Sequence, residues 1–237
     1  MVCYMKNSAK VITISLGGSI INPGTIDKEF LKEFRDMVVH HVEQTQDKFI
    51  IICGGGKVAR DYINASPDNI PPGQKDLTGI LATWVNAQLI ASWFQGYTPS
   101  KPSQEFYTFV NQIDDYPILV AGGFLPGIKT DEDAALCADY FKSPYLINVT
   151  NVDGVYDVDP RKNSKAKRFD HLSYKEFIDL IQHEDVGPGA SAPYTLIATK
   201  IAQRSNCRLL IVKKDIKAIK DAIEGINVGT EISDEGK

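Results

Sequence analysis

The sequence predicts an α/β fold, in which short buried strands alternate with helices. Three apolar runs, residues 11–14, 49–53 and 116–121, are too short for core helices and rich in β-branched residues, so each predicts a buried strand. Between the first two runs, apolar residues recur every three or four positions over residues 26–41, which predicts an amphipathic helix that begins near Thr25. Since a strand, a helix and a second strand form a right-handed crossover, the strands are expected to pair in parallel.

Each of the three runs is followed by a glycine-rich turn. The turns are Leu16-Gly17-Gly18-Ser19, Gly54-Gly55-Gly56-Lys57 and Gly122-Gly123-Phe124-Leu125-Pro126-Gly127. Ligands of an open parallel sheet bind at the carboxyl ends of the strands, and a residue without a Cβ atom lets backbone N–H groups close on an anion. Three such turns in one cleft indicate a phosphoryl donor and a phosphorylated acceptor.

Size and composition narrow the class of protein. A chain of 237 residues is long enough for one domain or two closely fused lobes. Its 26 basic and 30 acidic residues give a small negative balance without a basic block, which argues against nucleic acid or a membrane surface as a partner. The cysteines at positions 3, 53, 137 and 207 are scattered, as in a reduced, cytoplasmic protein, and no apolar run reaches the ~18 residues that span a bilayer.

The elements after the second turn follow from periodicity and turn signals. A short helix through residues 59–63 is followed by a loop at residues 66–73, expected at the substrate edge, and then by a longer helix over residues 77–94. The apolar face of that helix, which includes Trp84, is expected to pack in the core or between subunits. Residues 97–115 have weak periodicity and are expected to form a loop with one helix at most.

The second half of the chain alternates in the same way. Acidic residues 131–133 suit the first turn of a helix, and residues 145–149 predict the next strand. Ser173 and Glu176 have the spacing of a capping box, and residues 187–189 force a loop. The last predicted elements are a helix through Lys200, a strand at residues 209–212, a helix at 215–224 and a closing strand at 229–232.

With these residues in place, the chain resembles the amino-acid kinase superfamily and, within it, the archaeal-type uridylate (UMP) kinases, over nearly its whole length. The motifs that carry the resemblance are Leu16-Gly17-Gly18-Ser19, Gly54 to Arg60, Pro126-Gly127 with Thr130-Asp131, Thr150 to Tyr156 with Asp159-Pro160, and the carboxyl-terminal pair Gly229-Thr230. The resemblance implies a three-layer α/β/α sandwich with an open, mainly parallel sheet. It also implies a single domain, in which residues 1–143 bind the acceptor and residues 144–237 bind ATP.

The same resemblance implies an activity and a set of partners. ATP and UMP would react to give ADP and UDP, with Mg²⁺ as cofactor and no protein residue assigned to the metal. The chain would assemble as a homo-oligomer, a hexamer or a dimer. Because phosphoryl transfer needs little covalent chemistry from the protein, such a site positions the two nucleotides and stabilises charge.

Family positions carry over to individual residues as implications of the resemblance. The catalytic residues would be Lys57, Arg60 and Asp131. ATP would contact Ser15, Gly17, Gly18, Ser19, Gly56, Arg60, Thr150, Asn151, Tyr156 and Asp159. The acceptor would contact Gly55, Asp76, Phe124, Leu125, Pro126, Gly127, Ile128, Lys129 and Thr130.

Five positions depart from the family pattern. Ser15 stands where many members have a lysine that bridges the transferring phosphoryl group, and Thr195 stands where the family often has an aspartate. Phe124, Ile128 and Lys129 make the acceptor wall more apolar and add a charge. The altered wall leaves open another acceptor: an acylated amino acid, a carbamate or an isoprenyl phosphate, although the second turn lacks the histidine of isoprenyl phosphate kinases. Ser15 and Thr195 leave open a nucleotide- or anion-binding module without turnover.

Several of these residues also have a purely structural interpretation. Gly17 and Gly18 suit tight packing between helix and sheet as well as phosphate binding, and Lys57 suits a solvated helix start. Asp131 is favoured as a helix cap, a role that can coexist with catalysis. Cys53 is expected to be an inert core thiol, and the four histidines lack metal-ligand spacing.

Overall fold

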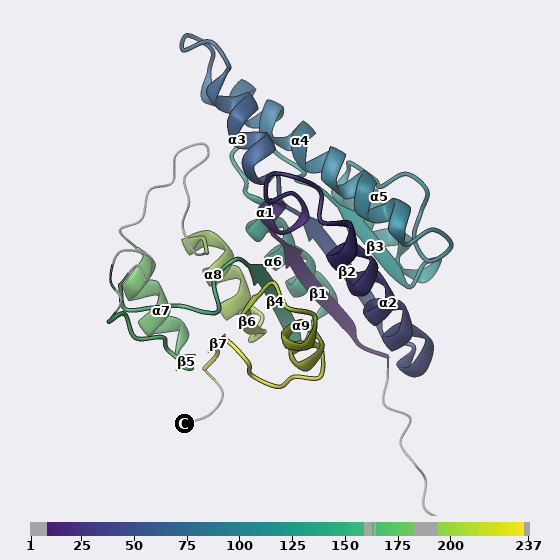
Figure 1. Ribbon diagram of the computed structural model, residues 1–237, viewed down its shortest axis with the longest axis vertical. Helices are drawn as coiled ribbons and strands as arrows, with labels where there is room; N and C mark the ends of the chain where they lie inside the picture. The colour runs from purple at the N-terminus through teal and green to yellow at the C-terminus, as the bar shows by residue number, and fades with distance from the viewer. Residues whose placement is uncertain (1–8, 159–162, 164, 183–193, 235–237) are drawn as a thin grey trace, which may run out of the picture.

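The computed structural model describes residues 9–158, 163, 165–182 and 194–234 of the chain (Figure 1). In this part of the chain, seven strands form one sheet in the order β3-β2-β1-β4-β6-β7-β5. The strands are β1 (Val11–Leu16), β2 (Lys48–Cys53), β3 (Ile118–Ala121), β4 (Tyr145–Thr150), β5 (His171–Leu172), β6 (Arg208–Lys213) and β7 (Thr230–Ile232). The predicted α/β class is confirmed.

Helices cover both faces of the sheet, which gives the three layers of the expected sandwich (Figure 1). They are α1 (Gly18–Ile21), α2 (Lys28–Thr45), α3 (Gly56–Asn64), α4 (Pro72–Trp93), α5 (Phe106–Asn111), α6 (Thr130–Phe141), α7 (Tyr174–Ile181), α8 (Leu196–Arg204) and α9 (Ile216–Ile223), with a 3₁₀ turn at Gln112–Asp114. Helices α2 and α9 contact each other on one face, and α6 and α8 contact each other on the opposite face. None of the described helices is long and apolar enough to cross a membrane.

The strand pairing places the carboxyl ends of four neighbouring strands at one edge of the sheet. Strand β1 pairs in parallel with both β2 and β4, and β2 pairs in parallel with β3. Strand β6 continues in parallel beside β4, whereas β7 runs antiparallel to β6. The chain therefore winds outward from β1 in both directions, and the predicted parallel pairing is confirmed.

Some element boundaries differ from the prediction for local chemical reasons. Helix α2 begins at Lys28 rather than near Thr25, because the Asp27 side chain caps it by accepting the Phe30 N–H at 3.1 Å. Helix α4 begins inside the predicted loop at residues 66–73, since Pro72 suits the first helical position, where no N–H is needed. Residues 97–115 contain one α-helix, α5, which the prediction allowed, whereas β5 was not expected. The predicted loop at residues 187–189 lies outside the described residues.

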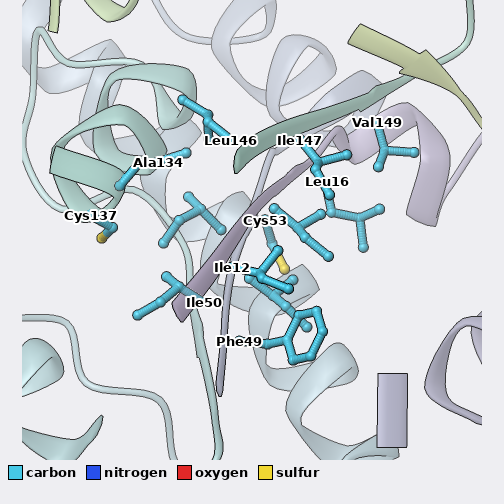
Figure 2. Packing of buried hydrophobic residues seen from close by; sticks show 14 of the residues in the cluster. Ile12, Leu16, Phe49, Ile50, Cys53, Ala134, Cys137, Leu146, Ile147 and Val149 are labelled. Atoms are coloured by element: carbon cyan, nitrogen blue, oxygen red, sulfur yellow. The ribbon is translucent and has the colours of Figure 1, made fainter. Parts of the chain in front are cut away.

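The core lies on both sides of the central strands. Figure 2 shows side chains from β1, β2, β4 and α6 in one buried cluster. Ile12, Phe49 and Ile147 are fully buried, and burial of each such side chain contributes about 1.5–3 kcal/mol. Cys53 is also fully buried, and the burial raises the pKa of its thiol well above the ordinary value, as expected of an inert core cysteine. Trp84 is buried in the same cluster, which confirms its expected place in the core.

Candidate active site

The sheet order brings the predicted motifs together. Because β3, β2, β1 and β4 are neighbours and run parallel, the third turn, the second turn, the first turn and the segment after β4 follow one another along one edge. Between β1 and β4 the winding direction reverses, which is the position where open α/β sheets bind ligands. The Gly17 N–H donates to the Val149 carbonyl at 3.3 Å and joins the first turn to β4 at this point. Four motifs far apart in the sequence thus border one site.

The first and second turns pack backbone against backbone. A Cβ atom on Gly18 would lie 2.2 Å from the Gly56 nitrogen, and one on Gly56, whose φ is +60°, would lie 2.4 Å from the Gly18 carbonyl carbon. Gly18 is therefore tightly packed, as expected, but against the second turn rather than between helix and sheet. This packing does not displace the anion-binding interpretation, because α3 begins at Gly56 and its first N–H groups have no partner within the helix. A helix start of this kind favours a phosphate.

The two cations expected to contact phosphate, Lys57 and Arg60, both lie on α3 and are exposed. The Lys57 Nζ atom pairs with the Asp61 carboxylate at 2.5 Å, one turn further along the same helix. The structure thus places Lys57 as a solvated residue at a helix start. Contact of either cation with phosphate stays a prediction.

Ser15 and Asp131 form a hydrogen-bonded pair beneath the first turn. The Ser15 side chain is 2% exposed and its hydroxyl donates to Asp131 Oδ1 at 3.0 Å. The expectation that Asp131 caps its helix is wrong: Glu132 accepts the Lys129 N–H at the start of α6, and Asp131 turns towards β1 instead. Burial raises the pKa of Asp131 to about 6, although the Ser15 hydrogen bond opposes the shift.

The third turn is held from behind by side chains of α4 and α6. Three of its backbone N–H groups already have acceptors: Gly123 on Thr83 Oγ1 at 2.8 Å, Phe124 on Asp133 Oδ2 at 3.3 Å and Gly127 on Asp76 Oδ2 at 2.9 Å. Just after the turn, the Lys129 N–H donates to Glu132 Oε2 at 2.6 Å. These amides are therefore occupied by acceptors within the protein, and contact of the third turn with a phosphorylated acceptor stays a prediction. Asp76, expected to contact the acceptor, holds the turn in shape.

The Phe124 side chain supports the third turn. Its ring packs against Trp84, Phe106 and Phe109, with ring centroids 6.2, 5.6 and 5.5 Å away. The apolar character that Phe124 adds therefore goes into an aromatic cluster between the turn and α5. Leu125 and Pro126, next in the turn, are exposed, and Ile128, Lys129 and Thr130 are half-buried.

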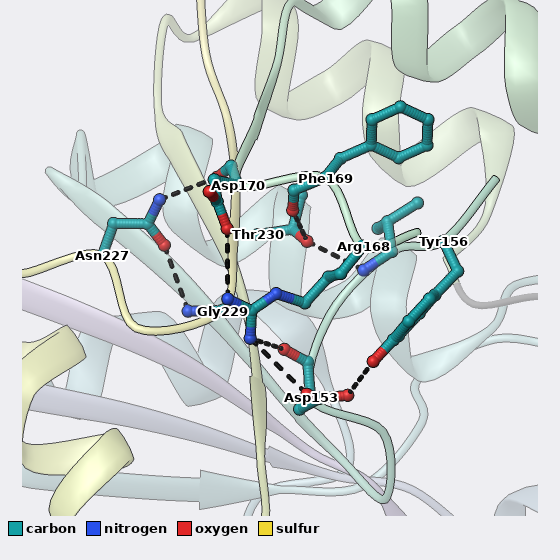
Figure 3. A network of polar contacts seen from close by, with 9 residues as sticks. Asp153, Tyr156, Arg168, Phe169, Asp170, Asn227, Gly229 and Thr230 are labelled. Atoms are coloured by element: carbon teal, nitrogen blue, oxygen red, sulfur yellow. Dashed lines mark hydrogen bonds and ion pairs between the residues drawn. The ribbon is translucent and has the colours of Figure 1, made fainter. Parts of the chain in front are cut away.

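A polar network fixes the segment after β4 (Figure 3). Tyr156 donates its hydroxyl hydrogen to Asp153 at 2.7 Å, and Arg168 pairs with Asp153 and Asp170. Gly154 has a φ of +154°, and a Cβ atom there would lie 2.5 Å from the Thr230 hydroxyl. Asp153 and Arg168, to which the sequence assigned no role, thus orient Tyr156. Thr150 and Asn151 contact each other at the end of β4, and Asp159 lies outside the described residues.

The described residues contain no group of three or more histidine, cysteine or acidic side chains able to hold a metal ion. Mg²⁺ in kinases is commonly bound by one or two carboxylates together with substrate phosphates. The single carboxylate of Asp131, near the first turn, fits that arrangement. A separate pocket of about 550 Å³ between α2 and α9, lined by His40, His41 and Lys220, contains none of the predicted site residues.

Comparison with known proteins agrees with this geometry. The model of the amino acid kinase family matches residues 10–213. A uridylate kinase of Thermoplasma volcanium is 38% identical over 90% of this chain and 93% of its own length, and one of Thermoplasma acidophilum is 37% identical over 94% and 97%.

Solved structures extend the similarity to three dimensions. The crystal structure of the uridylate kinase from Archaeoglobus fulgidus has a TM-score of 0.82 and 33% identity, and the match covers 94% of this chain and all of that one. A UMP kinase from Bacillus anthracis, at 19% identity and a TM-score of 0.73, has the same fold. The resemblance to uridylate kinases that the motifs predicted is confirmed, and the chain belongs to the amino acid kinase family.

Proposed function

We propose that the chain is a uridylate kinase, which transfers the γ-phosphoryl group of ATP to UMP and yields ADP and UDP. The observation that carries this proposal is the alignment of four motif-bearing strand ends along one sheet edge, at the point where the winding reverses. Relatives that cover nearly the whole chain at 38% and 37% identity are uridylate kinases, which supports UMP as the acceptor.

The position of each motif along the edge suggests its role. The first turn (Gly17, Gly18 and Ser19) and the segment after β4 (Thr150, Asn151 and Tyr156) adjoin each other and would bind ATP. The third turn, with Asp76 behind it, would bind UMP, and Gly55 and Gly56 lie between. In this arrangement residues 1–143 contribute the acceptor side, residues 144–237 contribute the donor side, and the first turn, although it belongs to the first of these ranges, reaches the ATP phosphates at the boundary between them.

The reaction requires two phosphates to meet in line. An oxygen of the UMP phosphate attacks the γ-phosphorus of ATP, and the bond from that phosphorus to the β,γ-bridging oxygen breaks as ADP leaves. The N–H groups at the start of α3 and the Arg60 guanidinium would stabilise the charge on the transferring group. Bound to the ATP phosphates, Mg²⁺ would neutralise part of that charge. Asp131, oriented by Ser15, is a carboxylate that fits as its ligand.

The first test is ADP release from ATP and Mg²⁺ by the purified chain, with UMP, CMP, purine monophosphates, N-acetylglutamate, carbamate and isopentenyl phosphate offered separately. We expect release with UMP well above the others. Release with a different acceptor would overturn the assignment of UMP. Binding of an ATP analogue without turnover on any acceptor would overturn the assignment as a kinase.

Arg60→Ala tests the proposed site. We expect turnover to fall at least tenfold, since a charge-assisted hydrogen bond to phosphate contributes about 1.5–3 kcal/mol. Lys32→Ala, which removes an exposed cation from α2, is the matched control and should leave turnover unchanged. Wild-type kinetics in Arg60→Ala would remove this residue from the site.

We further propose that the chain assembles as a homo-oligomer through α4. Leu77, Leu81 and Val85 lie one helical turn apart and are 50%, 63% and 68% exposed, so they form an apolar stripe on the outer face of the helix. The same stripe on a second copy would cover it in a symmetric dimer, and a hexamer would need a further interface. By light scattering, Leu81→Lys should reduce the molar mass, whereas Leu180→Lys on α7 should not. An unchanged mass in Leu81→Lys would exclude this interface.

The proposed setting is the cytoplasm. Cys53, Cys137 and Cys207 are free and buried, and scattered thiols of this kind are typical of proteins from reducing compartments.

A further inference from the structure

Helix α4 directs three buried polar side chains at the backbone of the second and third turns. Thr83, Trp84 and Asn86 are 6%, 8% and 4% exposed. Thr83 Oγ1 accepts the Gly123 N–H at 2.8 Å, and Trp84 Nε1 donates to the Gly123 carbonyl at 2.9 Å. Asn86 Nδ2 donates to the Gly54 carbonyl at 2.8 Å. Both peptide groups of Gly123, and one of Gly54, are thus held by one helix.

The Thr83 side chain also fits between the two turns. A Cβ atom on Gly122 would lie 2.4 Å from Thr83 Oγ1, and one on Gly55 would lie 3.3 Å from Thr83 Cγ2. The Thr83 hydroxyl donates its hydrogen to the Ile80 carbonyl at 2.6 Å, which leaves a lone pair for Gly123. The hydroxyl and the methyl group of Thr83 therefore each have a defined neighbour, one in each turn.

Ordinary core packing does not explain these residue types. Valine, phenylalanine and leucine would fill similar volumes without the free-energy cost of burying polar groups. Elsewhere on α4, Asp76, which is not buried, also accepts the Gly127 N–H of the third turn, whereas Thr78 donates to Gln74 in its own helix and Gln88 donates to the Ser100 carbonyl. The three buried groups are set apart because their partners are the turns that border the candidate active site.

We propose that Thr83, Trp84 and Asn86 are positioning residues, which fix the distance and orientation between the second and third turns and thereby the place of the acceptor phosphate. This inference rests on the proposed kinase function. Displacement of a reacting group by about 1 Å can lower a rate by about 100-fold. Because Thr83 acts on the acceptor side of the edge, its loss should affect UMP more than ATP.

The test compares Thr83→Val with Thr78→Val, which removes the same hydroxyl from the same helix at a position where it bonds to the helix itself. We expect Thr83→Val to lower kcat/KM for UMP about tenfold, which corresponds to about 1.4 kcal/mol, with KM for ATP unchanged. Thr83→Ser should restore kcat/KM to within about twofold of wild type, and Thr78→Val should match wild type. Asn86→Leu should lower kcat, whereas Gln88→Leu, which also removes an amide that bonds a carbonyl, should not.

The outcomes separate this inference from the kinase function. A wild-type chain that releases no ADP with UMP overturns the function, whatever the variants do. An active wild type with Thr83→Val within twofold of it overturns the positioning role. Equal losses for ATP and UMP that Thr83→Ser does not repair also overturn it, because they indicate general damage to the fold. If Thr83→Val fails to fold by circular dichroism, Trp84→Phe takes its place, and an unchanged KM for UMP in that variant refutes the inference.

Discussion

Asp133 carries a buried carboxyl group whose ionisation destabilises the fold, so removing its charge should stabilise the protein at alkaline pH. The side chain is 2% exposed, and burial, together with the neighbouring acids Glu132 and Asp131, raises its pKa to about 7 from 3.8. Between these values the folded protein keeps a proton that the unfolded chain releases. Stability due to this group is therefore complete below about pH 4 and is lost as the pH rises through about 7.

The magnitude follows from the shift in pKa. The pKa of Asp133 rises from 3.8 to about 7, which is about three units, and each unit corresponds to 1.36 kcal/mol. Ionisation of Asp133 therefore removes about 4 kcal/mol of stability at pH 8, relative to the fully protonated group. Asp133→Asn keeps the shape of the side chain, and its amide oxygen can still accept the Phe124 N–H. Its buried NH₂ group needs a new partner, which lowers the gain. Because about two of the three units lie between pH 5 and pH 7, we expect Asp133→Asn to be more stable than wild type at pH 8, and its advantage there to be about 3 kcal/mol larger than at pH 5.

Urea unfolding of both proteins at pH 5 and pH 8 measures this difference. Asp179→Asn, an exposed carboxyl on α7, is the matched control and should differ from wild type by less than about 0.5 kcal/mol at either pH. The reasoning is refuted if Asp133→Asn is no more stable than wild type at pH 8, or if its advantage is the same at pH 5.

Two further predictions concern stability. In Gly18→Ala the new Cβ atom would lie 2.2 Å from the Gly56 nitrogen, so the free energy of unfolding should fall by about 3 kcal/mol in a thermal melt. Gly73→Ala is the control, since a Cβ atom there would meet nothing within 4 Å, and it should be neutral or stabilising in the same melt. Arg208→Met leaves Glu231, only 9% exposed, without its bidentate partner and should cost about 2 kcal/mol at pH 7. Because Arg208 lowers the pKa of Glu231 below 4.5, this loss should shrink in urea titrations as the pH falls through the acid range; a constant loss would contradict the ion-pair explanation.

The strands and the glycine turns could be predicted from the sequence because their signals are local. Buried parallel strands are short runs of β-branched residues, and the turns that end them are rich in glycine, so β1, β2 and β3 were each located to within two residues at either end. The order of the strands could not be predicted from the residues, since pairing between β1 and β4 joins segments more than 100 residues apart. Strand β5 has two residues, too few for any periodicity.

At the candidate site, residue types were easier to predict than side-chain directions. The sequence correctly placed Asp131 in the first turn of a helix, where helix statistics favour a capping role. Its hydrogen bond to Ser15 joins residues 116 positions apart, so the local pattern could not predict it. The direction of Phe124 depends on rings contributed by α4 and α5, and Arg168 reaches Asp153 across a chain reversal. No short-range pattern encodes such contacts.

The first strand of the chain has a consequence for how the protein is made. Strand β1 lies between β2 and β4, and Thr13 pairs with Leu146 and Leu16 with Val149. During synthesis β1 can pair early with β2, but β4 emerges only after more than half of the chain has been made. Completing the sheet therefore depends on contacts between residues far apart in the sequence, and such contacts slow folding. A cut after residue 143 would leave β1 and β4 each with a bare edge prone to intermolecular pairing. The acceptor and donor sides are therefore expected to fold as one unit and to unfold together.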